Sequence, residues 1–242
     1  MAETIINSAT FKTLLIAVAG GIIPSLIWLW FWLQEDKESP EPAGLLIISF
    51  CLGMAAVYLV LPLQKFSVLL VPSSQPTLQA TLLAVIEEVA KFAAVFVIAL
   101  KSSYFDEPMD GVIYLVTAAL GFAAMENILY LLKDFNHGGS LVALLNASSR
   151  FIGATILHTI SSAIVGITIA FSFYQSRITK FVAVLLGLAI ASLLHAYFNL
   201  SIMGTKGTLN VLIAFTPYWA AIIGIIVLLE LIKHIKRPVN NA

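Results

Sequence analysis

The sequence predicts an all-α fold, a bundle of about seven transmembrane helices that forms one membrane domain. The chain is 60% hydrophobic and only 11% charged, with a mean hydropathy of +0.98, whereas soluble domains carry about 25% charged residues. Apolar stretches recur along all 242 residues, and each has about the 20 residues that a helix needs to cross a bilayer. No linker is long enough to divide the chain, so residues 1–242 are expected to form a single integral membrane domain.

Polar stretches that contain Pro or Gly separate the apolar segments. QEDKESPEP follows the first segment, PSSQP precedes the third, SYFDEPMDG precedes the fourth and KDFNHGGS follows it, and such stretches are typical of loops. A short segment at 140–147 is expected to be an interfacial helix that leads into the fifth span. The first apolar run is too long for a signal peptide and lacks a basic region before it, so we expect it to be retained. The predicted spans are 12–33, 43–63, 77–100, 110–132, 150–174, 180–202 and 209–233.

Charge gives an orientation and excludes one class of partner. Five basic residues fall on the side of the N-terminus and seven on the other side, so the positive-inside rule favours an N-terminus outside and a C-terminus inside. The formal net charge is zero, which argues against a nucleic-acid partner. The lipid bilayer is the partner that the apolar composition predicts.

Most ionisable side chains lie in loops or near the ends of the predicted spans, and six lie deeper within them. A charge at the middle of a bilayer costs about 2.5–3.5 kcal/mol even on the mildest insertion scale, so such residues usually serve a function. They are Glu87, Glu88 and Lys91 in the third span, Glu126 in the fourth, His158 in the fifth and His195 in the sixth.

Depth in the membrane relates these residues across the sequence. Successive spans alternate in direction, and a helix rises 1.5 Å per residue. Counted from the N-terminal face, Glu126, His158 and His195 lie about 7 or 8 residues in and Glu87 about 10, which is roughly 10–15 Å for all four. We therefore expect these four side chains to share one layer of the bilayer.

Helical spacing indicates which side chains face the same way. Glu87 and Lys91 are four residues apart, so Lys91 is expected to lie beside Glu87 and stabilise its ionised form. Glu88 points about 100° away and is expected to meet a neighbouring helix. His195 and Asn199 again share a face, which presents an imidazole and an amide to one space.

Five motifs in order resemble the PrsW family of intramembrane proteases, which is related to the CAAX-processing-type glutamic membrane proteases. They are EEVAK at 87–91, DGVIY at 110–114, GFAAMEN at 121–127, RFIGATILH at 150–158 and HAYFN at 195–199. The resemblance covers residues 77–202. One feature departs from the wider group, because its usual FxxxH motif here runs from Phe122 to Glu126 and ends in a carboxylate.

The resemblance implies an endopeptidase that cuts a membrane-embedded protein with a glutamate-activated water and needs no cofactor. It implies a single-pass membrane protein as substrate, for example an anti-sigma factor, and the cytoplasmic membrane of a prokaryote as the setting. Hydrolysis without a Ser or Cys nucleophile requires a base, an oxyanion stabiliser and a proton donor. Glu87 is expected to be the general base and His158 to hold the water. His195 and Asn199 are expected to stabilise the oxyanion, and Glu88 and Glu126 to orient a histidine or to replace Glu87 as the base. Lys91 and Asn127 are expected to support these residues.

Three alternatives remain open at the level of sequence. Glu126, His158 and His195 could form a zinc site with an open position, although no HExxH motif is present. Embedded Glu and His residues also serve as proton relays in transporters. A non-catalytic scaffold with the same fold is the third alternative, and the sequence leaves the oligomeric state open.

Overall fold

The computed structural model describes residues 10–204 and 208–235. For residues 137–152, 202–204, 208–215 and 217 it describes the backbone alone. Within these residues the fold is all-α and contains no strand, which confirms the predicted fold class. The elements are α2 (Phe11–Leu33), the short 3₁₀ helix η1 (Gln34–Asp36), α3 (Ala43–Leu70), α4 (Pro76–Ile98), α5 (Asp110–Phe171), α6 (Arg177–Gly204) and α7 (Thr208–Lys233).

The helix bounds agree with the predicted spans to within a few residues, apart from two differences. α3 continues to Leu70, seven residues beyond its predicted end at 63. The predicted non-helical break at KDFNHGGS is wrong, because helical backbone continues through it in α5. Five described stretches are long and apolar enough to cross a membrane: Phe11–Asp36, Ala43–Leu70, Asp110–Asn136, Gly153–Phe171 and Arg177–Ser201. Lys206, Lys236 and Arg237, which contribute to the predicted orientation, lie outside the described residues.

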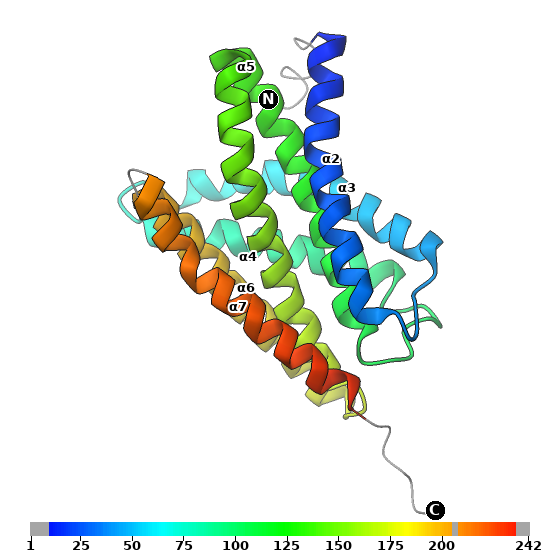
Figure 1. Ribbon diagram of the computed structural model, residues 1–242. Helices are drawn as coiled ribbons and strands as arrows, with labels where there is room; N and C mark the ends of the chain where they lie inside the picture. The colour runs from blue at the N-terminus through cyan, green and yellow to red at the C-terminus, as the bar shows by residue number, and fades with distance from the viewer. Residues whose placement is uncertain (1–9, 205–207, 236–242) are drawn as a thin grey trace, which may run out of the picture.

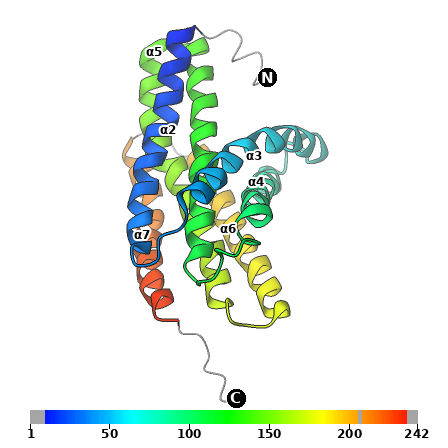
Figure 2. The same cartoon turned by 90° about the vertical axis from the view of Figure 1, so that its right-hand side faces the viewer.

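α5 doubles back on itself. Glu126 and His158 are 32 residues apart in sequence, yet their side chains are 2.8 Å apart, whereas a straight helix would separate them by about 48 Å. Figures 1 and 2 show the two green legs of α5 lying side by side. Sharp changes of helix direction commonly occur at Gly or Ser, and the predicted break contains Gly138 and Gly139. The polar stretch therefore marks a reversal of the chain without a loss of helical backbone.

The first leg of α5 is the centre of the bundle. Every residue from Met109 to Ala124 is buried, as expected of a helix that is surrounded by others. α2, α3, α4, α6 and α7 all pack against α5. In Figure 1, α3 and α4 run across the direction of the other helices.

Two glycines let α3 approach α5 closely. A Cβ atom on Gly53 would overlap the carbonyl group of Ala118, and one on Gly121 would overlap the carbonyl group of Phe50. Small residues at such crossings allow membrane helices to pack backbone against backbone. This contact fixes the position of α3 over the region of the bundle where the polar residues lie.

Candidate active site

The embedded ionisable side chains meet at one place inside the bundle. α4 contributes Glu87, Glu88 and Lys91, the second leg of α5 contributes His158, and α6 contributes His195. These five residues are at most 6% exposed. The first leg of α5 adds a half-buried glutamate. We term this group the central cluster: Glu87, Glu88, Lys91, Glu126, His158 and His195.

Hydrogen bonds connect most of the central cluster in a continuous sequence. Glu88 Oε1 accepts from Lys91 Nζ at 2.7 Å and lies 2.7 Å from His195 Nδ1. Lys91 Nζ is also 3.1 Å from His158 Nδ1. On the other side of that ring, Nε2 is 2.8 Å from Glu126 Oε2. Each histidine therefore has a carboxylate partner that fixes its ring orientation, as is usual for catalytic and metal-binding imidazoles.

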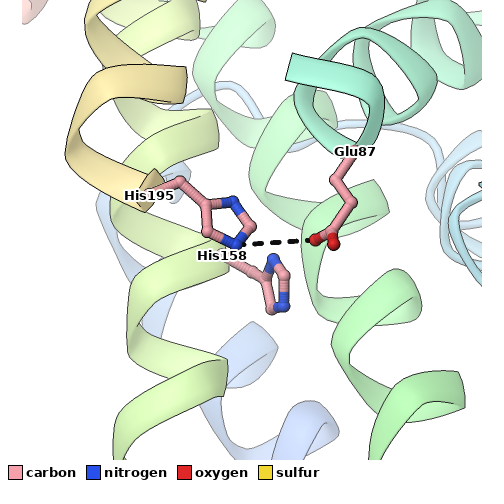
Figure 3. Close-up of side chains that lie close together, drawn as sticks. All are labelled: Glu87, His158 and His195. Atoms are coloured by element: carbon pink, nitrogen blue, oxygen red, sulfur yellow. Dashed lines mark ion pairs between the residues drawn. The ribbon is translucent and has the colours of Figure 1, made fainter. Parts of the chain in front are cut away.

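Glu87 and His195 face each other along one edge of the central cluster. His195 Nδ1 faces Glu88 Oε1, so a neutral ring that donates from Nδ1 presents the lone pair of Nε2 on its other side, whereas a protonated ring presents an N–H there. Nε2 is 3.5 Å from Glu87 Oε2, as Figure 3 shows. Two acceptors that face each other at this distance can share a proton, polarise a water molecule or ligate a metal ion. The same edge lies beside His158 in Figure 3.

One predicted pairing on α4 is wrong. Lys91 was expected to pair with Glu87, four residues before it, but its ammonium binds Glu88, three residues before it. Both spacings bring side chains together on a helix, so partners on other helices decide between them. His158 lies beside Lys91 and His195 beside Glu88, and these contacts orient both members of the pair toward α5 and α6.

Glu87 binds a residue that the sequence did not indicate. Gln64 Nε2 on α3 donates to Glu87 Oε1 at 2.5 Å. The predicted span ended at residue 63, which placed Gln64 at the membrane surface beside Lys65. The signal that could have identified it is the apolar stretch 66–71, which extends the helix by nearly two turns beyond this glutamine.

The neighbouring residues hold the cluster in place. The ring of Phe122 is 5.3 Å from that of His158, and Lys91 Nζ is 5.5 Å from the Phe122 centroid, an arrangement that permits a cation–π attraction. Asn127 Nδ2 donates to Thr155 Oγ1 at 3.2 Å and so ties the two legs of α5 together. Asn199 is half-buried on α6, and among the described residues the structure shows no hydrogen bond from it to the central cluster.

Three residues of the central cluster have the geometry of a metal site. Glu87, His158 and His195 each offer one ligand atom, and these atoms lie within 4.8 Å of one another. The sequence suggested Glu126 as the acidic ligand, whereas here Glu126 binds the outer side of His158. One carboxylate and two imidazoles form a donor set found in zinc hydrolases, and Glu88 supports His195 from behind. The three residues are therefore suitable ligands for a zinc ion, which would draw their ligand atoms closer together, since its bonds to N and O are about 2.0–2.2 Å long.

Comparisons with known proteins point to one family. Residues 41–229 match the family described as PrsW family intramembrane metalloprotease. A protein named Protease PrsW from Geobacillus kaustophilus is 30% identical over 144 residues, which cover 58% of this chain and 63% of that protein. The protein of the same name from Bacillus subtilis is 26% identical over 197 residues, 75% of this chain and 80% of its own length. The one from Halalkalibacterium halodurans is 25% identical over 212 residues, 85% of this chain and 93% of its own length. No solved structure gives a significant match.

Proposed function

The chain belongs to the PrsW family, and on that premise we propose that it is an intramembrane endopeptidase that hydrolyses a peptide bond with a water activated by Glu87. The observation that supports this best is the buried edge at which Glu87 Oε2 faces His195 Nε2 at 3.5 Å. A buried carboxylate next to a neutral imidazole is a suitable acceptor for the proton of an attacking water. The other members of the central cluster fix the orientation of these two groups.

The proposed reaction needs only water and the peptide. The water oxygen attacks the carbonyl carbon of the scissile bond while Glu87 takes one proton from the water. That proton then passes to the leaving nitrogen as the C–N bond breaks, and the products are a carboxylate and an amine. His195 and His158 border the position of the water, and Glu88 and Glu126 hold the two rings.

Two further roles complete this proposal. Lys91 balances the charge of Glu88, with which it forms a fully buried pair. Asn199, one helical turn beyond His195, is proposed to donate its amide to the oxyanion that develops on the substrate carbonyl. An amide is a suitable donor there because it supplies N–H groups without a charge that would have to be buried.

A zinc-dependent route to the same hydrolysis is the second candidate. The donor geometry of Glu87, His158 and His195 and the description of the family as metalloproteases favour it. Bound there, a zinc ion would act as a Lewis acid and lower the pKa of its water. His158 has Lys91 at one nitrogen and Glu126 at the other, so it would exchange one of these partners for the metal.

The proposed substrate is a single-pass membrane protein, with an anti-sigma factor as one example, and the proposed setting is a prokaryotic cytoplasmic membrane. The relatives named above come from bacteria. The described helices expose large apolar side chains along their outer faces, which fits a chain and a substrate that share one bilayer. The orientation with the N-terminus outside belongs to this proposal.

The test is a cleavage assay in liposomes with a panel of tagged single-pass segments. Replacement of a general base typically costs about 10²–10⁴-fold in rate, so Glu87→Gln should lower cleavage by that amount, while Glu38→Gln in the exposed loop after η1 serves as the control. Cleavage that survives a zinc chelator supports the glutamate route. Loss on chelation that added zinc restores assigns the reaction to the zinc route. Wild-type activity in Glu87→Gln would overturn both.

A further inference from the structure

Gln64 reaches the reacting carboxylate from a helix that carries none of the family-like motifs. It lies on α3, whereas Glu87, His158 and His195 lie on α4, α5 and α6. Its Nε2 donates a hydrogen bond to Glu87 Oε1 at 2.5 Å, and a carboxylate is the kind of acceptor that strengthens such a bond. This contact is independent of the arguments from motif order and depth that identified the other residues.

The course of α3 explains why this side chain points inward. Gly53, Val57, Val60 and Ser67 are buried along the helix, and with Gln64 they form a stripe at spacings of three, four and seven residues that faces the protein. Gln64 is half-buried on that stripe. Most of its neighbours on the other sides of α3 are exposed to the surroundings, including Leu63 at 51% and Phe66 at 60%.

Glu87 depends on Gln64 for a hydrogen-bond donor. Lys91, the cation on the same helix, is bound to Glu88 and His158. His195 Nε2 lies 3.5 Å from Oε2, which is 1 Å more than the distance from Gln64 Nε2 to Oε1, and in a neutral ring with Nδ1 donating to Glu88 it has no hydrogen to give. Among the described residues, the Gln64 amide is therefore the close donor that satisfies this buried carboxylate, and a buried carboxylate without a donor is costly.

We propose that Gln64 is a positioning residue for Glu87, an inference that rests on the proposed function. Its carboxamide holds Oε1 on the α3 side, so that Oε2 faces His195 and the position of the attacking water. Gln64 has no part in proton transfer, because an amide is neither a base nor an acid in the relevant range. Its effect is on the geometry of the reaction and so on kcat.

Two variants separate this role from simple packing. Gln64→Leu keeps much of the bulk of the side chain and removes the donor, and Gln64→Glu keeps the shape but places a second carboxyl group against Glu87. Loss of a residue that orients a reacting group typically costs about 10–100-fold. We expect Gln64→Leu to lower kcat by about this factor with KM changed less than about twofold, and Gln64→Glu to lower it further, since like charges side by side disfavour the ionised base.

The controls come from the same helix and from Glu87 itself. Lys65→Leu changes the exposed neighbour of Gln64 and should leave kcat unchanged. Glu87→Asp withdraws the carboxylate by one methylene, out of reach of Gln64, so adding Gln64→Leu to it should change kcat less than about twofold, as expected when one residue acts through the other. Should Gln64→Leu fail to fold, Gln64→Asn, which is one methylene too short, is measured in its place.

The measurement uses the full chain in liposomes and a tagged single-pass segment that the wild type cleaves, with kcat and KM determined for each variant. A kcat within about twofold of wild type in folded Gln64→Leu, while Glu87→Gln is inactive, overturns this inference alone. A rise in KM with kcat unchanged also overturns it, because that result indicates a substrate contact. Full activity of Glu87→Gln overturns the proposed function instead.

Discussion

The protein contains two buried groups of acidic residues that are stabilised in opposite ways. The central cluster combines its three glutamates with one lysine and two histidines. A second group, which we term the end cluster, lies where η1, the loop after it and the start of α5 meet. Its members are Asp36, Glu41, Asp110 and Tyr114.

None of the four members of the end cluster is basic, and Lys233, whose charge acts on Asp36, forms its ion pairs with Glu35 and Glu230. Asp110 Oδ2 accepts backbone N–H groups from Asp106 at 2.9 Å and Glu107 at 2.7 Å. Glu41 accepts a hydrogen bond from the Tyr114 hydroxyl. Burial raises the pKa of Glu41, and the nearby Asp110 carboxyl group adds to the increase.

The difference between the two clusters separates the proposed reactive site from a group of residues with a structural role. In the central cluster, paired charges keep carboxylates available inside the membrane, where their desolvation is expensive. In the end cluster, backbone N–H groups bind Asp110 and the Tyr114 hydroxyl binds Glu41, which joins the loop before α3 to the start of α5; Asp36 Oδ2 is buried without a hydrogen-bond partner among the described residues. Substitutions that remove a charge should therefore be severe in the first cluster and mild in the second.

The largest effect is expected for Lys91→Met. Removal of one member of a fully buried ion pair leaves the other uncompensated, which costs about 3–5 kcal/mol, and Lys91 and Glu88 are both about 1% exposed. The variant should unfold at a much lower denaturant concentration in detergent micelles and should lose cleavage. Lys65→Met on the exposed side of α3 is the matched control and should behave as wild type. A Lys91→Met protein as stable as the control would show that the charge balance of the central cluster does not depend on this lysine.

A smaller effect is expected for Asp110→Ala in the end cluster. The variant removes the acceptor of two part-buried hydrogen bonds from the N–H groups of Asp106 and Glu107, and the net loss of such a bond costs about 0.5–1.5 kcal/mol. Because Asp110 lies outside the central cluster, kcat of the folded protein should stay at the wild-type value. The two measurements are unfolding in micelles and cleavage in liposomes. A loss of kcat without a loss of stability would contradict the structural role given to the end cluster.

Hydropathy and spacing predicted the helices and the layer that the polar residues share, because both follow from the length needed to cross a bilayer and from the rise of a helix. They did not predict that Lys91 forms its ion pair with Glu88 and not with Glu87. That choice depends on how α4 is rotated toward α5 and α6, and two spacings on one helix are equally compatible with a contact.

The ends and turns of helices were the second source of error. The charge of Lys65 indicated that the span ends before it, so the sequence analysis missed the continuation of α3 and the contact of Gln64 with Glu87. The polar stretch after Lys133 indicated a loop, whereas the chain reverses with helical backbone. A polar stretch that contains Gly or Pro shows where the chain changes direction, but it does not show whether the backbone there is helical or a loop.

The smallest expected effect concerns Glu41, which lies outside the membrane-spanning helices. Burial raises the pKa of Glu41 from its ordinary 4.5 to about 8, and the nearby Asp110 and Asp36 carboxyl groups add to the increase. The folded protein therefore keeps this proton at neutral pH while the unfolded chain releases it. The stability that the folded protein gains from binding this proton more tightly than the unfolded chain is complete below pH 4.5, and it is lost as the pH rises through about 8.

Glu41→Gln tests this difference directly, since glutamine resembles the protonated acid and does not titrate. We expect the variant to show a weaker fall in melting temperature between pH 5 and pH 8 than the wild type, and to gain stability relative to it at the upper end. Glu38→Gln in the same loop, at an exposed position, should retain the wild-type slope. Equal slopes for Glu41→Gln and the wild type would mean that Glu41 is ionised in the folded protein. The end cluster would then hold its negative charge without a bound proton, and the contrast with the central cluster would rest on backbone N–H donors alone.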